Sequence, residues 1–596
     1  MSLSRRNFVI ATSLAAGGSI VLSACSSGDA GGSGGKSGTP EAGATKYTGS
    51  TVTIGTKADS TGPAPEIPGA KKGGTIYGVS EDDFSHLDPQ RIYFAFNSSA
   101  ALLFARCLTG YRIDDKGALT LVGDLATDTG TASPDNKSWT FTLKDGLKWQ
   151  DGSELTVEDV RHGIERAWAP FITEGAAYVQ QALTGKGDWR KGYEGPYGGK
   201  HLEQIVTDKA KKTITFNLKE ARPDFNFTLA MHSYAATPLK LDTKEKYDKQ
   251  PVSCGPYIVK HRSIDKSMTL TRNKHWDPAT DSIRNAYPDT FEFEFGPSSL
   301  ESADRFIADQ GKDQQMVSIY KAVPAERIQK VLTDPELKKR SFNGLLTGTY
   351  YYAINCRRIT DVQVRKALNI AWPLEQIRKI YGGPSAGDYA TTLLSPDILG
   401  REKFDLYGKL KTPQGDPEAA KAILEKAGKA GQKIVYTYPQ SPTYDKTAVV
   451  VENALKKAGF TPVMKPVDST SYYDQIQQTD NSFDVMWFGW SPDWPTAYTM
   501  IQPLLDSASI GNGQNNVSQA KVDWIDAAIK ENVVISDQQK AGAAWTALDK
   551  RIMDEVVPII PETYQRRFYQ FGSKVGGAMM DPLFSATLLY RTYVKA

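Results

Sequence analysis

The pattern that most limits the folds open to this chain is an alternation of strand, helix and strand in its second half. The apolar runs at Ile434 to Tyr438 and Val463 to Val467 predict two strands, and Val449 to Ala458 between them has helical spacing. Two strands joined by a crossover helix pair in parallel through a right-handed connection. The pattern therefore predicts an α/β fold built on a parallel sheet.

The stretch that follows this unit has the strongest features of a binding site. Phe483 to Trp487 predicts another buried strand, and residues 488–495 read FGWSPDWP directly after it. In open parallel sheets, ligands bind at the carboxyl ends of the strands. Asp493, a carboxylate among tryptophans at such a place, indicates a ligand site, although an aspartate between two prolines is also typical of a simple turn.

The first half of the chain also mixes strands and helices. Residues 139–143 alternate apolar and polar side chains, and Asp145-Gly146 after them is a hairpin signal. Thr156 begins a capping-box pattern at the start of an amphipathic helix. Further strands are expected at residues 214–218 and 291–295, so both halves predict a mixed α/β protein.

The N-terminus carries the features of an exported lipoprotein. Arg5 and Arg6 lie in a stretch that resembles the twin-arginine export signal, and the apolar run at residues 8–22 is shorter than the roughly 20 residues a membrane span needs. Leu22-Ser23-Ala24-Cys25 resembles a lipobox, in which the cysteine is acylated. We expect residues 1–24 to be a signal peptide and Cys25 to hold the protein on the lipid bilayer. The alternative is an unlipidated signal peptide with a chance cysteine.

Composition predicts a tether after the anchor and argues against polyanionic partners. Residues 25–72 are dominated by Gly, Ser, Thr, Ala and Pro, which bury too little apolar surface to offset the entropy of ordering, so this segment is expected to be flexible. The formal net charge is +3, and about +1 once Arg5 and Arg6 leave with the signal peptide. We therefore expect no nucleic-acid partner.

Cysteine and histidine placement gives no sign of a metal or cofactor. Cys107, Cys254 and Cys356 are far apart in the chain, so one disulfide with a free thiol is possible and the pairing stays open. The histidines are scattered and form no motif with metal-ligand spacing. No cofactor and no metal are expected.

Five blocks resemble the family 5 extracellular solute-binding proteins that serve ABC importers. The blocks follow the family order and span nearly everything after Lys72. They are Gly73-Gly74-Thr75 with Leu87-Asp88-Pro89, the block from Trp139 to Val160, Gly255-Pro256-Tyr257, the block from Tyr350 to Asn355, and the block from Val364 to Leu368.

The resemblance implies a two-lobe periplasmic-binding-protein fold, of the class with an extra subdomain on lobe one and a ligand cleft between the lobes. The expected boundaries are 73–296 for lobe one, about 116–205 for its inserted subdomain, 297–557 for lobe two, and 558–596 for the return to lobe one. In the oligopeptide-binding branch, an extended peptide is held mainly through its backbone, and the lobes close over it.

The same resemblance implies the residues that touch ligand. Asp493 corresponds to the aspartate that receives a peptide's α-ammonium, and Gly489 and Trp490 should line the N-terminal end of the peptide. Trp494 is either a cleft residue or a core aromatic, since large aromatics are often buried for packing.

Further residues match cleft positions of the family. Tyr351 and Tyr320 correspond to cleft positions of the oligopeptide branch, and Asp83 and Phe84 lie where lobe one contributes backbone contacts. Trp487 departs from relatives that bind short peptides, which have arginine there to meet a terminal carboxylate. Longer peptides, or ligands without a free C-terminus, are therefore favoured.

The resulting prediction is a binding protein without chemistry of its own. It would sit on the outer face of the bacterial cell membrane and, as a monomer, deliver oligopeptides to a membrane-spanning ABC permease. Alternatives are a receptor of the same family for a nickel chelate or an oligosaccharide, and, from another class, a secreted hydrolase. The hydrolase lacks support because no pair of carboxylates can be placed at a catalytic distance from sequence alone.

Overall fold

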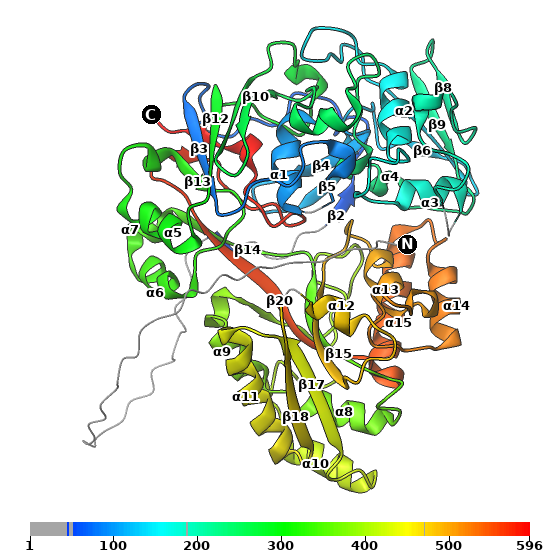
Figure 1. The fold of residues 1–596 in the computed structure, drawn as a ribbon, viewed down its shortest axis with the longest axis vertical. Helices are drawn as coiled ribbons and strands as arrows, with labels where there is room; N and C mark the ends of the chain where they lie inside the picture. The colour runs from blue at the N-terminus through cyan, green and yellow to red at the C-terminus, as the bar shows by residue number, and fades with distance from the viewer. Residues whose placement is uncertain (1–44, 47–51, 94, 186–188, 470) are drawn as a thin grey trace.

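The computed structural model describes residues 45–46, 52–93, 95–185, 189–469 and 471–596. The expected export and anchor residues Arg5, Arg6 and Cys25 lie outside this part of the chain. Figure 1 shows a two-lobe α/β molecule, with a subdomain of short strands and helices beside the first lobe. Within the described residues, no helix combines the length and the apolar character needed to cross a bilayer.

The first lobe is built on a mixed sheet in the order β10-β11-β12-β3-β13. Its strands are β3 (Thr75–Ser80), β10 (Tyr257–Ser263), β11 (Ser267–Arg272), β12 (Thr290–Phe295) and β13 (Met316–Ser318). The expected strand at residues 291–295 is confirmed as β12, which pairs in parallel with β3. Because β13 also pairs with β3, the sheet of this lobe continues past the boundary expected at 296–297.

Short elements surround this sheet. They are the strands β2 (Val52–Ile54), β4 (Thr109–Ile113) and β5 (Leu119–Gly123), and the helices α1 (Ala95–Phe104), α4 (Phe225–Thr228), α5 (Ser299–Ala308), α6 (Ala325–Thr333) and α7 (Pro335–Lys339).

The segment from Val52 to Lys72 differs from the flexible tether expected there. Strand β2 pairs in parallel with β5, Ser60 is fully buried, and Arg112 forms a 2.9 Å ion pair with Asp59. Composition does not predict this ordered segment, because its few apolar side chains pack on strand β5 rather than building a core of their own. The folded part of the chain thus begins before Gly73.

The subdomain has its own sheet and its own core. The antiparallel order is β6-β7-β9-β8, covered by α2 (Val157–Arg166) and α3 (Tyr178–Thr184). The strands are β6 (Thr131–Ala132), β7 (Ser138–Thr142), β8 (Ile205–Asp208) and β9 (Thr213–Asn217). The predicted capping box is confirmed, since the Thr156 backbone N–H and hydroxyl both donate to Asp159 at 2.9 Å. Apolar side chains such as Phe141, Ile164 and Phe216 form the core.

The second lobe is built on a sheet in the order β1-β14-β20-β15-β19-β17-β18, with β16 against β20. Its strands are β1 (Thr45–Lys46), β14 (Ser341–Leu345), β15 (Thr349–Ile354), β16 (Gly387–Tyr389), β17 (Lys433–Pro439), β18 (Thr461–Val467), β19 (Val485–Trp490) and β20 (Ile559–Gln570). Its helices are α8 (Val362–Ala371), α9 (Leu374–Ile380), α10 (Pro417–Lys426), α11 (Pro442–Lys457), α12 (Tyr472–Ile476), α13 (Tyr498–Leu505), α14 (Asp523–Asn532) and α15 (Gln538–Arg551).

The predicted strand-helix-strand unit is confirmed as β17, α11 and β18, although α11 begins seven residues before the start expected at Val449. Strands β17 and β18 pair in parallel, and α11 begins at Pro442 because the Ser441 hydroxyl accepts the backbone N–H of Tyr444. Strand β19 pairs with β17 in parallel and with β15 in antiparallel register. It runs on to Trp490, three residues beyond the strand end expected at Trp487.

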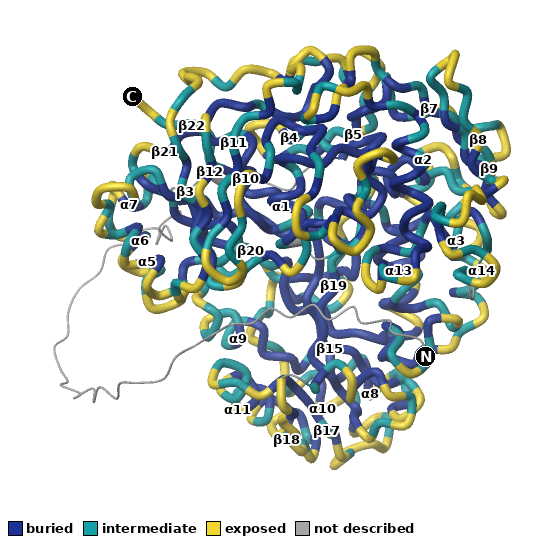
Figure 2. Tube along the Cα trace, turned by 45° about the horizontal axis from the view of Figure 1, so that its top comes forward, coloured by how far each residue is buried: buried dark blue, intermediate teal, exposed yellow. Residues whose placement is uncertain are grey.

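Strand β20 connects the two lobes. Its first half pairs with β15 and its second half with β14, and a bridge from Phe571 to Val317 then joins it to the first lobe's sheet. Figure 1 shows β20, in red, running across the molecule between the lobes. Figure 2 shows that β15 and β19 are buried along their length, whereas α10, α11 and β18 carry the exposed outer surface of the second lobe.

The cysteines form no disulfide in the described part of the chain, where Cys107, Cys254 and Cys356 are all free thiols. Burial raises the pKa of the Cys254 thiol to about 12 and that of Cys356 to about 11. These thiols therefore stay protonated and unreactive at neutral pH.

Candidate functional site

Asp493 lies where the second lobe meets both the first lobe and its subdomain. It follows β19 in the loop before α13. Its carboxylate accepts a hydrogen bond from the Tyr93 hydroxyl at 2.5 Å, and a second, short one from the Tyr178 hydroxyl. Tyr93 precedes α1 in the first lobe and Tyr178 begins α3 in the subdomain. The carboxylate thus joins three parts of the fold.

Trp494 makes a parallel connection beside Asp493. Its indole N–H donates to the Asp224 carboxylate at 2.9 Å, and its ring packs edge-on against Tyr178 with centroids 4.8 Å apart. Asp224 lies just before α4, and burial raises the pKa of its carboxyl. Next to this contact, the Arg222 guanidinium lies 4.6 Å from the centre of the Tyr498 ring. Trp494 therefore packs across the lobe interface rather than inside one lobe.

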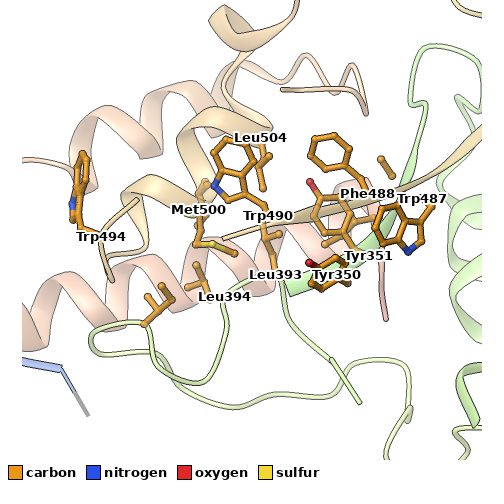
Figure 3. Packing of buried hydrophobic residues seen from close by; sticks show 14 of the residues in the cluster. Tyr350, Tyr351, Leu393, Leu394, Trp487, Phe488, Trp490, Trp494, Met500 and Leu504 are labelled. Carbon is orange, nitrogen blue, oxygen red and sulfur yellow. The ribbon is translucent and has the colours of Figure 1, made fainter. Parts of the chain in front are cut away.

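Gly489 and Trp490 are the last two residues of β19 in the sheet of the second lobe. Gly489 pairs with Tyr350 on β15, and a Cβ atom there would lie 2.6 Å from the Tyr350 ring. The Trp490 indole N–H donates to the backbone carbonyl of Thr499 at 2.7 Å, which ties β19 to α13. Figure 3 shows Trp490 packed near Met500 and Leu504, with Trp494 well apart from it.

Tyr351 lies in the core of the second lobe. Its side chain is 2 % exposed, and its ring centroid is 5.7 Å from that of Phe488. In Figure 3 the two rings lie together on the side of Trp487. This position favours a packing role over direct contact with a ligand.

The remaining predicted site residues form a second group in the first lobe. Phe84 stacks on Phe96 at 4.6 Å, and the Phe96 ring lies 5.3 Å from Tyr320. Asp83 forms a 3.1 Å ion pair with Arg262, which also donates to the Phe84 carbonyl. The Tyr320 ring lies 4.8 Å from the guanidinium of Arg567 on β20. The structure therefore places Asp83, Phe84 and Tyr320 near one another in the first lobe, where the Tyr320 ring faces Arg567 on β20.

Sequence patterns missed the tyrosines that hold Asp493. Tyr93 and Tyr178 stand 400 and 315 residues away from Asp493 in the chain. Neither belongs to a motif, and an isolated tyrosine is as common in cores as in sites. Only the fold brings them together.

The arrangement at Asp493 suits recognition of a cation. An ionised carboxylate accepts hydrogen bonds at about four positions, so it can receive an ammonium group as well as hydroxyl donors. The aromatic faces of Trp494 and Tyr178 nearby are also favourable surroundings for a positive charge. Among the described residues, no group of three or more His, Cys, Asp or Glu side chains could hold a metal ion.

Comparison with known proteins identifies the family of this chain. The family model of the middle region of bacterial extracellular solute-binding proteins, family 5, matches residues 120–512. The periplasmic murein peptide-binding protein MppA of Escherichia coli is 26% identical over 444 residues, which cover 72% of this chain and 77% of that protein. The periplasmic oligopeptide-binding protein OppA of Salmonella typhimurium is 25% identical over 470 residues, covering 75% and 80%.

Solved structures agree on the fold. The clavulanic acid biosynthesis oligopeptide binding protein 2 superposes with a TM-score of 0.81 at 27% identity, covering 92% of this chain and 99% of that one. The unliganded open form of MppA gives a TM-score of 0.71 at 19% identity, covering 88% and 98%. With a family model matching well over half of its length, this chain belongs to family 5 of the bacterial extracellular solute-binding proteins.

Proposed function

We propose that this protein is an exported, lipid-anchored receptor that captures oligopeptides between its lobes and hands them to an ABC import permease. The observation that carries the proposal is Asp493, a carboxylate at the lobe interface that is held by hydroxyls from the opposite side. Relatives with similar sequences are named for binding murein peptides and oligopeptides, which supports a peptide as the ligand class.

The proposed role of Asp493 is to receive the α-ammonium group of the peptide. An ammonium group removed from water needs an anion within hydrogen-bond reach, and a charge-assisted bond of this kind contributes about 1.5–3 kcal/mol. Tyr93 and Tyr178 approach the same carboxylate from the other lobe and the subdomain. Ligand binding and lobe closure would therefore converge on one side chain, and the extended backbone of the peptide would add the rest of the contact.

The first prediction tests this role with Asp493→Asn, which keeps the shape of the side chain and removes its charge. Leaving a buried ammonium without its anion costs about 3–5 kcal/mol, so the tightest peptide from a thermal-shift screen should bind at least about a hundredfold more weakly. The same peptide with an acetylated N-terminus should bind the wild type poorly and lose little more in the variant. Calorimetry on the four combinations measures this non-additivity.

A matched variant separates this effect from a general loss of charge. Asp304→Asn breaks a 2.6 Å pair with Arg327 on the first lobe, far along the chain from the site. It should leave peptide affinity unchanged. Equal losses for the free and the acetylated peptide in Asp493→Asn would return Asp493 to the role of a turn residue.

The same screen discriminates between the alternative functions. Tryptophans also stack on sugar rings, so oligosaccharides and nickel chelates belong in the thermal-shift panel beside the peptides. A hit confined to sugars or chelates would replace the peptide proposal. A hydrolysis assay on peptide and glycan pools tests the hydrolase, which only appearance of product would support.

The second prediction concerns the anchor. Cys25→Ala should release the protein from the membrane without lowering its melting temperature, because a Gly- and Ser-rich segment is expected to separate the anchor from the fold. Replacing Arg5 and Arg6 with lysine should impair export if the twin-arginine route is used. Membrane retention of Cys25→Ala in a fractionation experiment would contradict the lipid anchor.

A further inference from the structure

A cluster of buried side chains around Glu562 in the second lobe holds polar atoms with unmet hydrogen-bonding capacity. We call it the Glu562 cluster. Among the described residues no hydrogen bond of normal geometry reaches these atoms, although Tyr352 and Trp487 lie close enough to the Glu562 carboxyl to lower its pKa against the larger effect of burial. The atoms are Glu562 Oε2, the hydroxyls of Tyr352, Tyr381 and Tyr436, and the indole N–H groups of Trp372 and Trp487.

Strand geometry directs these side chains to one place. Tyr352 on β15 stands directly opposite Trp487 on β19. The pairing of β15 with β20 shifts between Tyr350 and Tyr351, which leaves Glu562 unpaired between the partners Pro561 and Thr563. A bulge of this kind re-aims a side chain and is frequent beside functional sites. It places the Glu562 carboxyl where Tyr352 and Trp487 both act on it.

Aromatic rings enclose the carboxyl on several sides. The Tyr352 ring lies 4.5 Å from Trp372 and 5.8 Å from Tyr436, and Tyr444 lies 4.9 Å from Trp487. A carboxylate among aromatic faces is the arrangement that proteins use to hold organic cations, because both attract positive charge. The hydroxyls of the tyrosines add acceptors for N–H donors.

The protein itself supplies no close cation to this carboxylate in its described part. Glu562 is 3 % exposed and forms no ion pair. The basic group that acts on it is Lys409, whose ammonium donates to the Asn369 carbonyl at 3.4 Å instead. Burial raises the pKa of Glu562 to about 7 and lowers that of Lys409 to about 7, so each charged form lacks adequate solvation.

The cluster is also connected through the chain to the proposed peptide site. Trp487 is six residues before Asp493 on the same strand and loop, a distance of at most about 20 Å for an extended chain. Tyr350, whose ring lies 5.5 Å from Trp487, extends the cluster toward Arg567 and Tyr320 at the lobe junction. An extended peptide of about five residues anchored at Asp493 is long enough to bring one of its side chains near the cluster.

We propose that the Glu562 cluster is a subsite for a cationic side chain of the bound peptide, a guanidinium or an alkylammonium group. The proposal rests on the proposed peptide-binding function and specifies its ligand class. It also accounts for tryptophan at position 487, where an arginine would compete with the ligand's cation for Glu562.

The experiment is a positional scan with a neutral twin for each peptide. Penta-alanine is synthesised with a single arginine at each of the five positions, and again with citrulline, which has the shape of arginine without its charge. Calorimetry on the wild type should show, at one position, at least about tenfold tighter binding of the arginine peptide than of its citrulline twin. Lysine at that position should retain part of the gain. Equal binding of arginine and citrulline at all five positions would overturn the proposal.

The variant Glu562→Gln assigns the effect to this carboxyl. It should abolish the preference for arginine over citrulline, whereas Asp388→Asn, which breaks an exposed 2.8 Å pair with Arg566, should keep it. A preference that survives in folded Glu562→Gln would also overturn the proposal. If that variant does not fold, Tyr381→Phe replaces it, because losing one acceptor should reduce the preference.

The outcomes distinguish the cationic subsite from the proposed capture of peptides. Penta-alanine that binds in an Asp493-dependent way, with no advantage for arginine anywhere, refutes the subsite and leaves peptide capture standing. Binding of none of these peptides, together with no peptide hit in the thermal-shift screen, refutes both. An arginine advantage that depends on Glu562 supports both.

Discussion

At the scale of single residues, Trp494 offers a direct test of the contacts that hold the lobes together. Trp494→Phe keeps an aromatic ring against Tyr178 and removes the indole N–H that binds Asp224 at 2.9 Å. A buried acceptor without its donor costs about 1–3 kcal/mol, and we expect this cost to fall on the form in which the second lobe meets the subdomain. Peptide affinity measured by calorimetry should drop about tenfold or more, with a small change in the melting temperature of the ligand-free protein.

Trp168→Phe provides the matched control for this prediction. It removes an indole hydrogen bond of 3.0 Å to the Trp189 carbonyl inside the subdomain. The control should lower the melting temperature and leave peptide affinity unchanged. If Trp494→Phe behaved in the same way as the control, its indole would be a core contact and not part of closure.

Single residues also show how far sequence patterns reach. The position of Asp493 at a strand end and beside tryptophans was enough to nominate it, because strand ends in parallel sheets are where ligands bind. Its partners could not be nominated, because Tyr93 and Tyr178 come from remote segments with no motif. Glu562 was equally hidden, since a register shift in β20 rather than any local pattern directs it inward.

At the scale of secondary structure, β19 depends on the absence of a side chain at Gly489. A Cβ atom at this position would lie 2.6 Å from the Tyr350 ring, closer than any normal contact. Gly489→Ala should force that ring to move and destabilise the protein by about 1–3 kcal/mol, as overpacked core substitutions do. Gly198→Ala, where a Cβ atom meets nothing within 4 Å, should be close to neutral. Chemical denaturation of both variants measures the difference, and equal stabilities would contradict the packing argument.

Secondary structure was predictable where several local sequence signals indicate the same element. It was less predictable where a segment becomes a strand only by pairing with another strand. The unit β17, α11 and β18 follows from apolar spacing, whereas the start of α11 at Pro442 depends on the Ser441 cap that the spacing does not mark. The end of β19 does not, because Phe488-Gly489-Trp490 reads as a loop and is strand only through its pairing with β15. Strand β2 was missed for the same reason, since its docking on β5 makes a strand of a segment whose composition indicates a linker.

At the scale of the whole molecule, the order of the family motifs predicts the two lobes, but not the contacts between them. Those contacts come from loops whose meeting depends on the lobe arrangement, as with Tyr93, Tyr178 and Asp493. Motifs reflect local folding requirements, whereas contact between the lobes depends on pairs of side chains distant in sequence. The closing contacts are therefore where substitution should separate ligand affinity from stability.

The last prediction concerns closure itself. A peptide that binds between the lobes should make the protein more compact in solution scattering, and at a free concentration of 100 times Kd it should add about 2.7 kcal/mol of stability. Tyr93→Phe with Tyr178→Phe removes both hydroxyls that reach Asp493 across the interface. Because hydrogen bonds to charged groups contribute about 1.5–3 kcal/mol each, this double variant should need at least about tenfold more peptide to reach the same compaction.

The control for closure is another tyrosine that binds an aspartate, placed away from the lobe interface. Tyr197 donates to Asp242 at 2.5 Å within the subdomain. Tyr197→Phe should lower the melting temperature because a buried carboxylate loses a donor, yet it should leave the peptide concentration needed for compaction unchanged. The double variant should show the opposite pattern, since Tyr93 and Tyr178 contact Asp493 between parts of the fold that we expect to separate on opening. A saturating peptide that leaves the radius of gyration of the wild type unaltered would contradict hinge closure, and an unaltered Kd in the double variant would remove Tyr93 and Tyr178 from it.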